Sequence, residues 1–93
     1  MIDAEQRPRL AAKARLRFDE PTQTYLLLYP ERGMKLNATG SSIVQLCDGA
    51  STVGGIVASL AHTYAKPAAE LAVEVEAFLQ ALADRGLIEW VAP

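Results

Sequence analysis

Apolar and polar residues alternate along the first third of the chain and recur every three or four residues along the remainder. Within Lys13–Phe18, leucine and phenylalanine alternate with arginine, the period of two that is typical of a half-buried strand. Gln23–Tyr29 is apolar on both faces, and Met34–Leu36 is a short third segment. Proline and glycine mark turns at Asp19–Thr22 and Pro30–Gly33. The pattern predicts three strands before residue 37.

The stretch from Leu36 to Gly49 reads as the end of a strand, a cap, one short helix and a turn. Asn37 is suited to the N-cap, because its side-chain oxygen can accept a hydrogen bond from the first helical turn. Ile43, Leu46 and Cys47 share one face of the predicted helix. Gly49 follows Asp48 and can adopt the left-handed conformation that ends a helix at little cost.

Two further helices follow. Ser51 and Thr52 are expected to cap the first of them, although Gly54-Gly55 makes a weak start, since each glycine costs roughly 1 kcal/mol relative to alanine. Pro67 suits the first turn of the last helix, and Gly86 ends it. The apolar stripes are Val53, Ile56, Val57, Leu60 and Tyr64 in one helix, and Leu71, Val75, Phe78 and Leu82, flanked by Leu79, in the other. Leu87–Val91 either adds a short strand or lays Trp90 against the core.

We therefore expect an α+β fold that resembles a winged helix-turn-helix, with three N-terminal β-strands followed by three α-helices. Residues 1–7 are polar and are expected to form a flexible N-terminus, and Pro8–Leu10 an extended approach to the sheet. Residues 8–93 are expected to form a single domain with one modest core. This fold serves both DNA binders and peptide binders, so it does not by itself define a function.

Composition narrows the choice of partner and of cellular compartment. The chain has 93 residues, of which 51% are apolar and 22% charged, and a formal net charge of −2. This charge gives no general attraction to nucleic acid or to an anionic membrane, and no apolar run approaches the roughly 20 residues that span a bilayer. A single cysteine requires no oxidising compartment, and MIDAEQRPRL lacks the apolar segment of a secretory signal. We expect a cytoplasmic protein without a membrane or nucleic-acid partner.

Cys47 and His62 are the residues that invite a catalytic interpretation. Cys47 falls on the buried stripe of its helix, where a thiol is an ordinary small apolar group. His62 lies about 180° from the centre of its helix stripe, hence towards solvent, and neither residue has an evident orienting partner. These two side chains also fall short of the three or four ligands of a metal site. The expectation is no catalytic residue, no metal and no cofactor.

DNA binding through the last helix is disfavoured by charge. That helix carries four acids, Glu70, Glu74, Glu76 and Asp84, against Arg85, a net charge of −3, whereas a recognition helix brings positive charge to phosphates. Basic residues gather instead at Arg7, Arg9, Lys13, Arg15 and Arg17. They form either a solvated strand face or a surface for an acidic partner. A winged-helix regulator of transcription is therefore the weakest of the functional hypotheses.

An ordered series of segments carries a family resemblance. PERGMKLN (Pro30 to Asn37) runs into LNATGSSIVQLCDG, and STVGGIVASL and VEAFLQALADRGLI follow. Together they resemble pyrroloquinoline quinone (PQQ) biosynthesis protein D, the PqqD family, across roughly Pro8 to Ile88. The family often has a glutamate near the start of the second helix, and Gly54-Gly55 stands at that position here.

The resemblance implies a non-catalytic peptide chaperone, a recognition element for a ribosomally made, later modified precursor peptide. It would bind a PqqA-like precursor and present it to a PqqE-like radical S-adenosylmethionine (SAM) enzyme. In that family the peptide adds a strand beside the third strand and lies against the third helix, which is β-augmentation. The corresponding edge here is Met34, Lys35 and Leu36. On the helix, the expected contacts are the ridge Val73, Ala77 and Ala81, together with Leu71, Val75 and Phe78, which are mainly core.

Two alternatives accompany this interpretation. The same module could serve another modified-peptide pathway, which the identity of a neighbouring radical enzyme would decide. The chain could also form a homodimer by strand exchange, because three helices cover one side of a sheet whose middle strand is apolar on both faces. Either Tyr25, Leu27 and Tyr29 or Leu26 and Leu28 would then lack a cover. Pro30–Gly33 would be the hinge, unless the segment around Leu10 folds over the open face.

Overall fold

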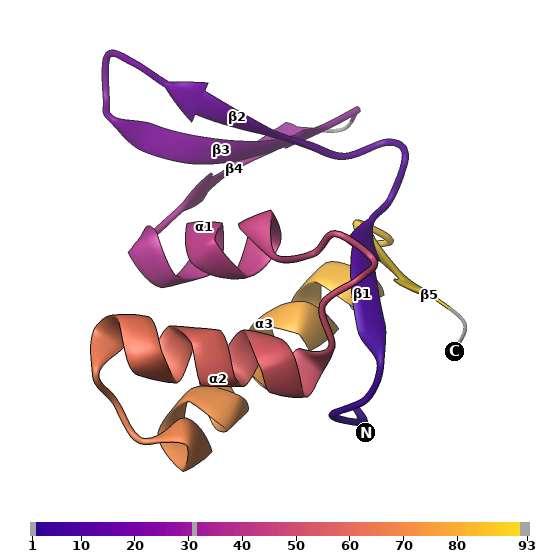
Figure 1. The fold of residues 1–93 in the computed structure, drawn as a ribbon. Helices are drawn as coiled ribbons and strands as arrows, with labels where there is room; N and C mark the ends of the chain where they lie inside the picture. The colour runs from indigo at the N-terminus through magenta and orange to yellow at the C-terminus, as the bar shows by residue number, and fades with distance from the viewer. Residues whose placement is uncertain (1, 31, 92–93) are drawn as a thin grey trace.

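The computed structural model describes residues 2–30 and 32–91 as five strands and three helices (Figure 1). Met1 of the predicted N-terminal segment, Glu31 of the predicted second turn and residues 92–93 of the predicted domain lie outside the described residues. The elements in chain order are β1 (Arg7–Leu10), β2 (Arg15–Asp19), β3 (Thr24–Tyr29), β4 (Arg32–Leu36), α1 (Ala38–Gln45), α2 (Val53–Tyr64), α3 (Ala68–Asp84) and β5 (Ile88–Val91).

The three strands predicted from the alternating pattern form one antiparallel sheet in the order β2-β3-β4. Leu16 on β2, Leu27 on β3 and Met34 on β4 lie directly opposite one another, and residues in register share a face of a sheet. Leu27 is fully buried, and Leu16 and Met34 pack against the same core. The face that carries these three residues therefore points to the helices.

The sequence pattern undercounted the strands, although the α+β winged-helix class is confirmed. β1 and β5 pair with each other as a separate two-stranded sheet, with Leu10 opposite Ile88. The short strand offered as one alternative for Leu87–Val91 is confirmed as β5, and Trp90 within it also packs against the core. The predicted extended approach at Pro8–Leu10 is part of β1, whose partner lies at the other end of the chain. The predicted first strand, Lys13–Phe18, is β2, which begins two residues later.

The segment before β1 contacts the start of α2. The amides of Val53 and Gly54 donate to the carbonyls of Gln6 and Ala4, at 2.9 and 2.8 Å. The amide of Gly55 donates to the N-cap Thr52 at 3.0 Å. These bonds occupy amides that a helix start otherwise leaves unpaired, which explains how α2 begins at a glycine pair. The flexibility expected for residues 1–7 stays a prediction, with β1 beginning at Arg7.

All three helices lie on one side of the β2-β3-β4 sheet, with α1 next to it and α2 and α3 beyond (Figure 1). Asn37 caps α1 as predicted, and Gly86, with a positive φ angle of 69°, directly follows the C-cap of α3 as predicted. The predicted end of the first helix at Gly49 is wrong, because α1 ends at Gln45, and Gly49, with a φ angle of 81°, lies in the turn beyond it. Leu46, predicted in the α1 stripe, is instead its half-buried C-cap residue. The core joins Leu27 of the sheet to residues from every helix, among them Ile43, Ile56, Leu71, Val75 and Leu79.

Candidate functional site

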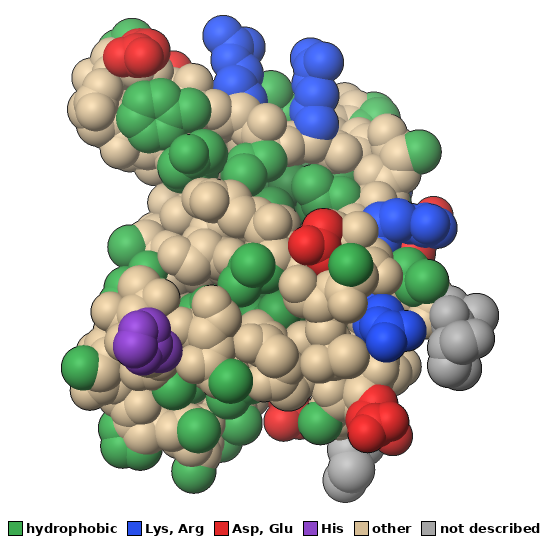
Figure 2. Space-filling model, in the orientation of Figure 1, with side chains coloured by type: hydrophobic (Ala, Val, Ile, Leu, Met, Phe, Trp, Pro, Cys, Tyr) green, Lys and Arg blue, Asp and Glu red, His purple; other side chains and the backbone are tan. Residues whose placement is uncertain are grey.

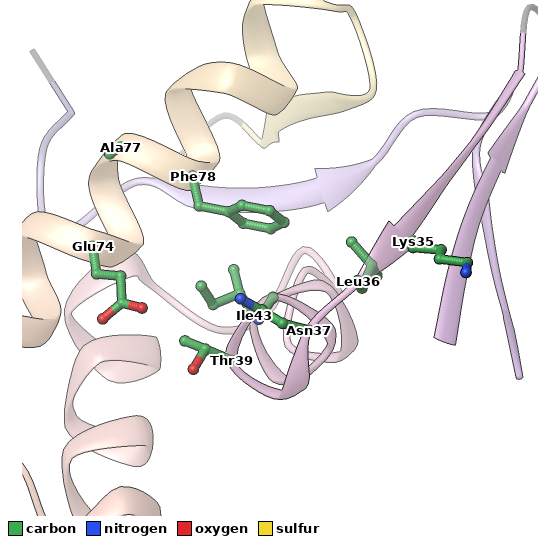
Figure 3. A pocket seen from close by; sticks show the side chains of 9 residues that line it. Lys35, Leu36, Asn37, Thr39, Ile43, Glu74, Ala77 and Phe78 are labelled. Carbon is green, nitrogen blue, oxygen red and sulfur yellow. Dashed lines mark hydrogen bonds between the residues drawn. The ribbon is translucent and has the colours of Figure 1, made fainter. Parts of the chain in front are cut away.

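β4 forms one edge of its sheet, since β3 pairs with it on one side and the described residues place no strand on the other. An edge strand leaves backbone N–H and C=O groups available to another chain. Leu36, at the end of β4, is buried towards the helices. Figure 3 shows the Lys35 side chain pointing away from Leu36, as the alternation of a strand requires. The exposed edge therefore has an apolar side next to α1 and a basic side opposite it.

A pocket of about 530 Å³ lies between this edge, α1 and α3, within the roughly 300–1,000 Å³ common for binding sites. Figure 3 shows Phe78 reaching from α3 over the start of α1, with Leu36 and Ile43 beside it. We call this pocket the groove, and its lining residues are Lys35, Leu36, Asn37, Thr39, Gly40, Ile43, Glu74, Ala77 and Phe78. Its inner part is apolar, and its rim carries polar groups.

The N-terminus of α1 shapes the groove. The Asn37 side-chain oxygen accepts a hydrogen bond from the amide of Gly40 at 2.7 Å, which fixes the first turn of the helix directly after β4. A Cβ atom on Gly40 would lie 3.3 Å from Cζ of Phe78 and 3.0 Å from Oδ1 of Asn37, both tighter than ordinary van der Waals contact. The absence of a side chain at Gly40 therefore allows the Phe78 ring to approach α1.

Contacts from α2 support the same turn. The hydroxyl of Tyr64 donates to the carbonyl of Ala38 at 3.2 Å and lies 2.9 Å from the hydroxyl of Ser42. Ser41 is buried, and its hydroxyl donates to the same Ala38 carbonyl at 3.0 Å. The groove wall that α1 provides is thus held by three side-chain hydroxyls as well as by its cap.

The structure brings together four of the nine predicted peptide-binding residues, since Lys35, Leu36, Ala77 and Phe78 line the groove. Met34 packs against the core beside it. Leu71 and Val75 are 1% and 0% exposed, so both are core residues beneath the site. Val73 and Ala81 are exposed on α3 but do not line the groove. Of the predicted ridge, Ala77 alone reaches it.

Sequence reasoning missed five lining residues, which are Asn37, Thr39, Gly40, Ile43 and Glu74. All but Glu74 belong to the cap and first helix, where the sequence indicated a structural role. That role is real, because Asn37 caps α1 and Ile43 is 1% exposed. Their position immediately after the predicted edge strand was the available signal, since a helix that begins at Asn37 must flank Leu36.

α3 is acidic, and one of its acidic side chains, Glu74, lines the groove. Glu70 and Glu74 are exposed, and Glu76 is half-buried, along the helix that would have to enter a DNA groove. Within residues 2–30 and 32–91, no ion pair involves Glu74 or Lys35, and Arg9 pairs with Glu89 at 2.9 Å on the second sheet. The net negative charge of α3 disfavours nucleic acid, because a recognition helix brings positive charge to phosphates.

Cys47 lies away from solvent, with its thiol donating to the carbonyl of Ile43 at 3.3 Å. Burial, and secondarily the carboxylate of Asp48, raise the pKa of Cys47 to about 12, so the thiol is protonated at neutral pH, the form that is a poor nucleophile. His62 is exposed on α2. In the described part of the chain, no three His, Cys, Asp or Glu residues form a cluster suited to a metal ion, and none of the helices has the length and hydrophobicity that crossing a bilayer requires.

These features define a small α+β domain of the winged-helix type in which a free strand edge borders an apolar groove. Such an arrangement is suited to strand addition by a peptide. Residues 24–88 match the sequence model of coenzyme PQQ synthesis protein D (PqqD). The chain belongs to the PqqD family.

Individual relatives agree with this assignment. A PqqA binding protein of Rhodopseudomonas palustris (strain HaA2) is 41% identical over 87 residues, which cover 94% of this chain and 85% of the relative. The bifunctional coenzyme PQQ synthesis protein C/D of Methylorubrum extorquens is 35% identical over 82 residues, or 88% of this chain and 22% of that protein. The solution structure of the PqqD truncation of Methylobacterium extorquens PqqCD is similar with a TM-score of 0.82 and 32% identity, covering 96% and 95% of the two chains. That protein is described as a stand-alone recognition element for a ribosomally synthesised and post-translationally modified peptide.

Proposed function

We propose that this protein is a non-catalytic peptide chaperone of PQQ biosynthesis, which binds a PqqA-like precursor peptide and presents it to a PqqE-like radical SAM enzyme. Membership of the PqqD family and the PqqA-binding relatives support this role. The observation that carries it is the groove beside the free edge of β4. The protonated thiol of Cys47 supports a binding role rather than nucleophilic chemistry, and its single unpaired cysteine is compatible with the cytoplasm.

The peptide would bind as a fourth strand beside β4. Within the edge Met34, Lys35 and Leu36, alternate residues would supply the main-chain hydrogen bonds to the peptide, because the others bond to β3. These bonds are independent of peptide sequence. Alternate peptide side chains would point to the helices, where Leu36, Ile43 and Phe78 would accept an apolar one. Affinity would thus come from the edge, and selectivity from the groove.

The residues of α3 would contribute in different ways. Ala77 and Phe78 would contact the peptide directly, because they line the groove. Leu71 and Val75 would keep α3 packed against the core beneath the groove, since both side chains are buried. Val73 and Ala81 lie one helical turn on either side of Ala77, so they would extend the contact to a peptide segment that continues along α3.

Titration with a synthetic PqqA peptide of Rhodopseudomonas palustris tests this function. Backbone amide shifts in the ¹⁵N-labelled protein are expected to cluster in 32–40 and 74–81. Lys35→Pro removes a backbone donor and restricts φ, whereas Lys35→Ala keeps the amide. The proline variant is therefore expected to bind the peptide at least about tenfold more weakly than the alanine variant, if strand addition supplies most of the affinity.

Circular dichroism of both variants provides the control for folding. Shifts confined to β1, β5 or the β2 edge would contradict the assignment of the groove. If the two Lys35 variants bind the peptide saturably and with the same affinity, the peptide remains the partner, but strand addition to this edge is rejected.

A further inference from the structure

The second face of the β2-β3-β4 sheet has no helix over it (Figure 1). Two rows of side chains cross this face. Arg17, Leu26 and Lys35 are in register in one row, and Arg15, Leu28 and Gly33 in the other. We call these six residues the outer face. Both leucines are half-buried and all three basic residues are exposed, so the face has an apolar centre between cations.

Gly33 confirms the direction in which Leu28 points. A Cβ atom built on Gly33 would lie 3.0 Å from Cδ2 of Leu28. The leucine side chain therefore lies over the glycine, towards the β4 edge. Gly33 has no positive φ angle, so the space it leaves, rather than its backbone freedom, is what this position provides. Leu28 therefore lies against the backbone of β4 at the centre of the outer face.

The cations of the outer face have no acidic partner in residues 2–30 and 32–91, where no ion pair involves Arg15, Arg17 or Lys35. Asp19, at the end of β2, is the acidic residue whose position in the strand matches this face, and its carboxylate accepts from the hydroxyl of Thr22. The described charges here sum to about +2, against −2 for the whole chain. Figure 2 shows basic side chains standing away from the sheet on the side opposite the helices.

A second cavity continues the outer face. It has a volume of about 360 Å³ and includes Arg15 and Leu28 in its lining, together with Ala12, Lys13, Ala14, Tyr29 and Pro30. A partner that covers the two leucines could thus place one side chain beside the aliphatic stem of Arg15. Long basic side chains cover apolar neighbours with their stems while their charged ends stay in water.

We propose that the outer face docks an acidic, partly apolar surface of a protein partner. This proposal rests on the proposed function, in which a peptide chaperone must contact the modifying enzyme while it holds the peptide. The groove opens on the helix side of β4, and the outer face lies on the other side. Lys35 belongs to both surfaces, but Arg15, Arg17, Leu26 and Leu28 do not line the groove. The enzyme can therefore approach the β2 and β3 part of the outer face without displacing the peptide.

Charge favours this occupant over two others. A second copy docking through the same face would bring like charges together, which costs several kcal/mol when they are juxtaposed. A nucleic-acid duplex presents mainly phosphates and little apolar surface to Leu26 and Leu28, and its binding depends on the number of phosphate contacts. An acidic protein surface satisfies both the cations and the leucines.

The test compares two double variants of equal net charge. Arg15→Glu with Arg17→Glu reverses the outer face, and Lys66→Glu with Arg85→Glu reverses two exposed basic residues elsewhere. Each pair changes the net charge by −4, from −2 to −6. The probe is the purified radical SAM enzyme of the PQQ pathway of Rhodopseudomonas palustris, titrated with and without the PqqA peptide.

The outer-face variant is expected to bind the enzyme at least about tenfold more weakly, and the control within about twofold of wild type. Both are expected to keep the peptide affinity of wild type within about threefold. Enzyme binding by wild type should weaken between about 50 and about 300 mM salt, because exposed charges are screened over that range. If Arg15→Glu with Arg17→Glu does not fold, Leu26→Asn and Arg17→Gln are measured in its place.

Equal enzyme binding by the two double variants, or none by wild type, overturns the proposal. Binding of a duplex DNA probe that the outer-face variant abolishes overturns it in favour of a nucleic acid. Failure of the PqqA peptide to bind wild type rejects the proposed function instead, and the enzyme titration without peptide then reports on the outer face alone.

Discussion

Gly40→Ala tests the groove because the single added methyl group would contact both the Phe78 ring that lines the groove and the Asn37 side chain that caps α1. The new Cβ would lie 3.3 Å from Cζ of Phe78 and 3.0 Å from Oδ1 of Asn37. The ring and the cap must each move by a few tenths of an ångström. The substitution therefore narrows the groove from its α1 side without adding charge or removing a hydrogen-bonding group.

The expected change in stability is small. Replacing glycine by alanine in a helix gains up to about 1 kcal/mol. Weakening the Asn37 cap costs about 0.5–2 kcal/mol, and displacing the Phe78 side chain from its preferred rotamer costs about 0.5–1.5 kcal/mol. The net is a loss of roughly 1 kcal/mol, against the roughly 5–14 kcal/mol expected for the whole domain. The variant should remain folded in chemical denaturation.

Gly55→Ala is the matched control. Gly55 is the third residue of α2, as Gly40 is of α1, and its amide donates to the N-cap Thr52 as that of Gly40 donates to Asn37. A Cβ on Gly55 would lie 3.2 Å from Oγ1 of Thr52, with no contact to Phe78. The two variants thus share the helix and cap effects and differ in the groove.

Peptide affinity is the measurement that separates them. Gly40→Ala is expected to weaken PqqA binding at least about fivefold, which corresponds to about 1 kcal/mol and to the burial of roughly one methylene group. Gly55→Ala is expected to bind as wild type does. Calorimetric titration of the two variants with the PqqA peptide measures this difference in affinity. Wild-type affinity in Gly40→Ala would refute the role given to the space between Gly40 and Phe78.

Other variants and measurements test the fold around the site. Val75→Glu is expected to destabilise the domain by roughly 3 kcal/mol or more, because it buries an uncompensated polar group. Val73→Glu, at a position 71% exposed, should cost about 1 kcal/mol at most, even with like charges nearby. Equal losses of stability in urea denaturation would show that the helix faces are misassigned. Asp48→Ala should lower stability most near neutral pH, because the backbone amides of Ser51 and Ala50 lower the pKa of Asp48. The stability that Asp48 contributes is present above the pKa of the unfolded state, about 3.9, and is lost as the pH falls through the lower pKa of the folded state. A stability difference between wild type and Asp48→Ala that persists at pH 2 would contradict this account. Cys47 should react with a thiol reagent at neutral pH only as the protein unfolds, given its burial and a pKa of about 12; rapid labelling of the native protein would be the opposing result. If the chain forms the strand-exchanged homodimer, which is one of the two alternatives for its oligomeric state, light scattering should give a mass that rises with concentration, whereas a constant monomer mass would exclude it.

Local pattern predicted the parts of this fold that depend on neighbouring residues. The alternation in β2, the cap at Asn37 and the helix end at Gly86 each involve residues a few positions apart, and the structure confirms them. The helix end predicted at Gly49 is wrong, since the first helix already ends at Gln45. β1 was expected only as an extended approach, and the strand at Leu87–Val91 only as one of two alternatives, because the pairing of β1 with β5 joins Arg7 to Val91. Four residues with mixed polarity contain no period that distinguishes a strand from an extended loop.

The site was predicted less completely than the fold for a related reason. Helical periodicity placed Val73, Ala77 and Ala81 on one face, yet the groove meets that face only where α1 and β4 approach it, at Ala77. Periodicity gives the direction of a side chain about its own helix but not its distance from another element. Glu74 illustrates this, since it was counted from the sequence only in the net charge of α3, and it lies at the groove.

The N-terminus of α1 shows why fold and site overlap in this chain. β4 ends at Leu36, the cap is Asn37, and the glycine that admits the Phe78 ring comes three residues later. The same short turn therefore ends the edge strand, begins the helix and sets the width of the groove. A substitution here acts on both stability and binding, so only variants matched in their helix and cap effects can separate the two. The β2 part of the outer face has no such overlap, because Arg15 and Arg17 are exposed and do not line the groove, so their charges can be reversed without disturbing the core.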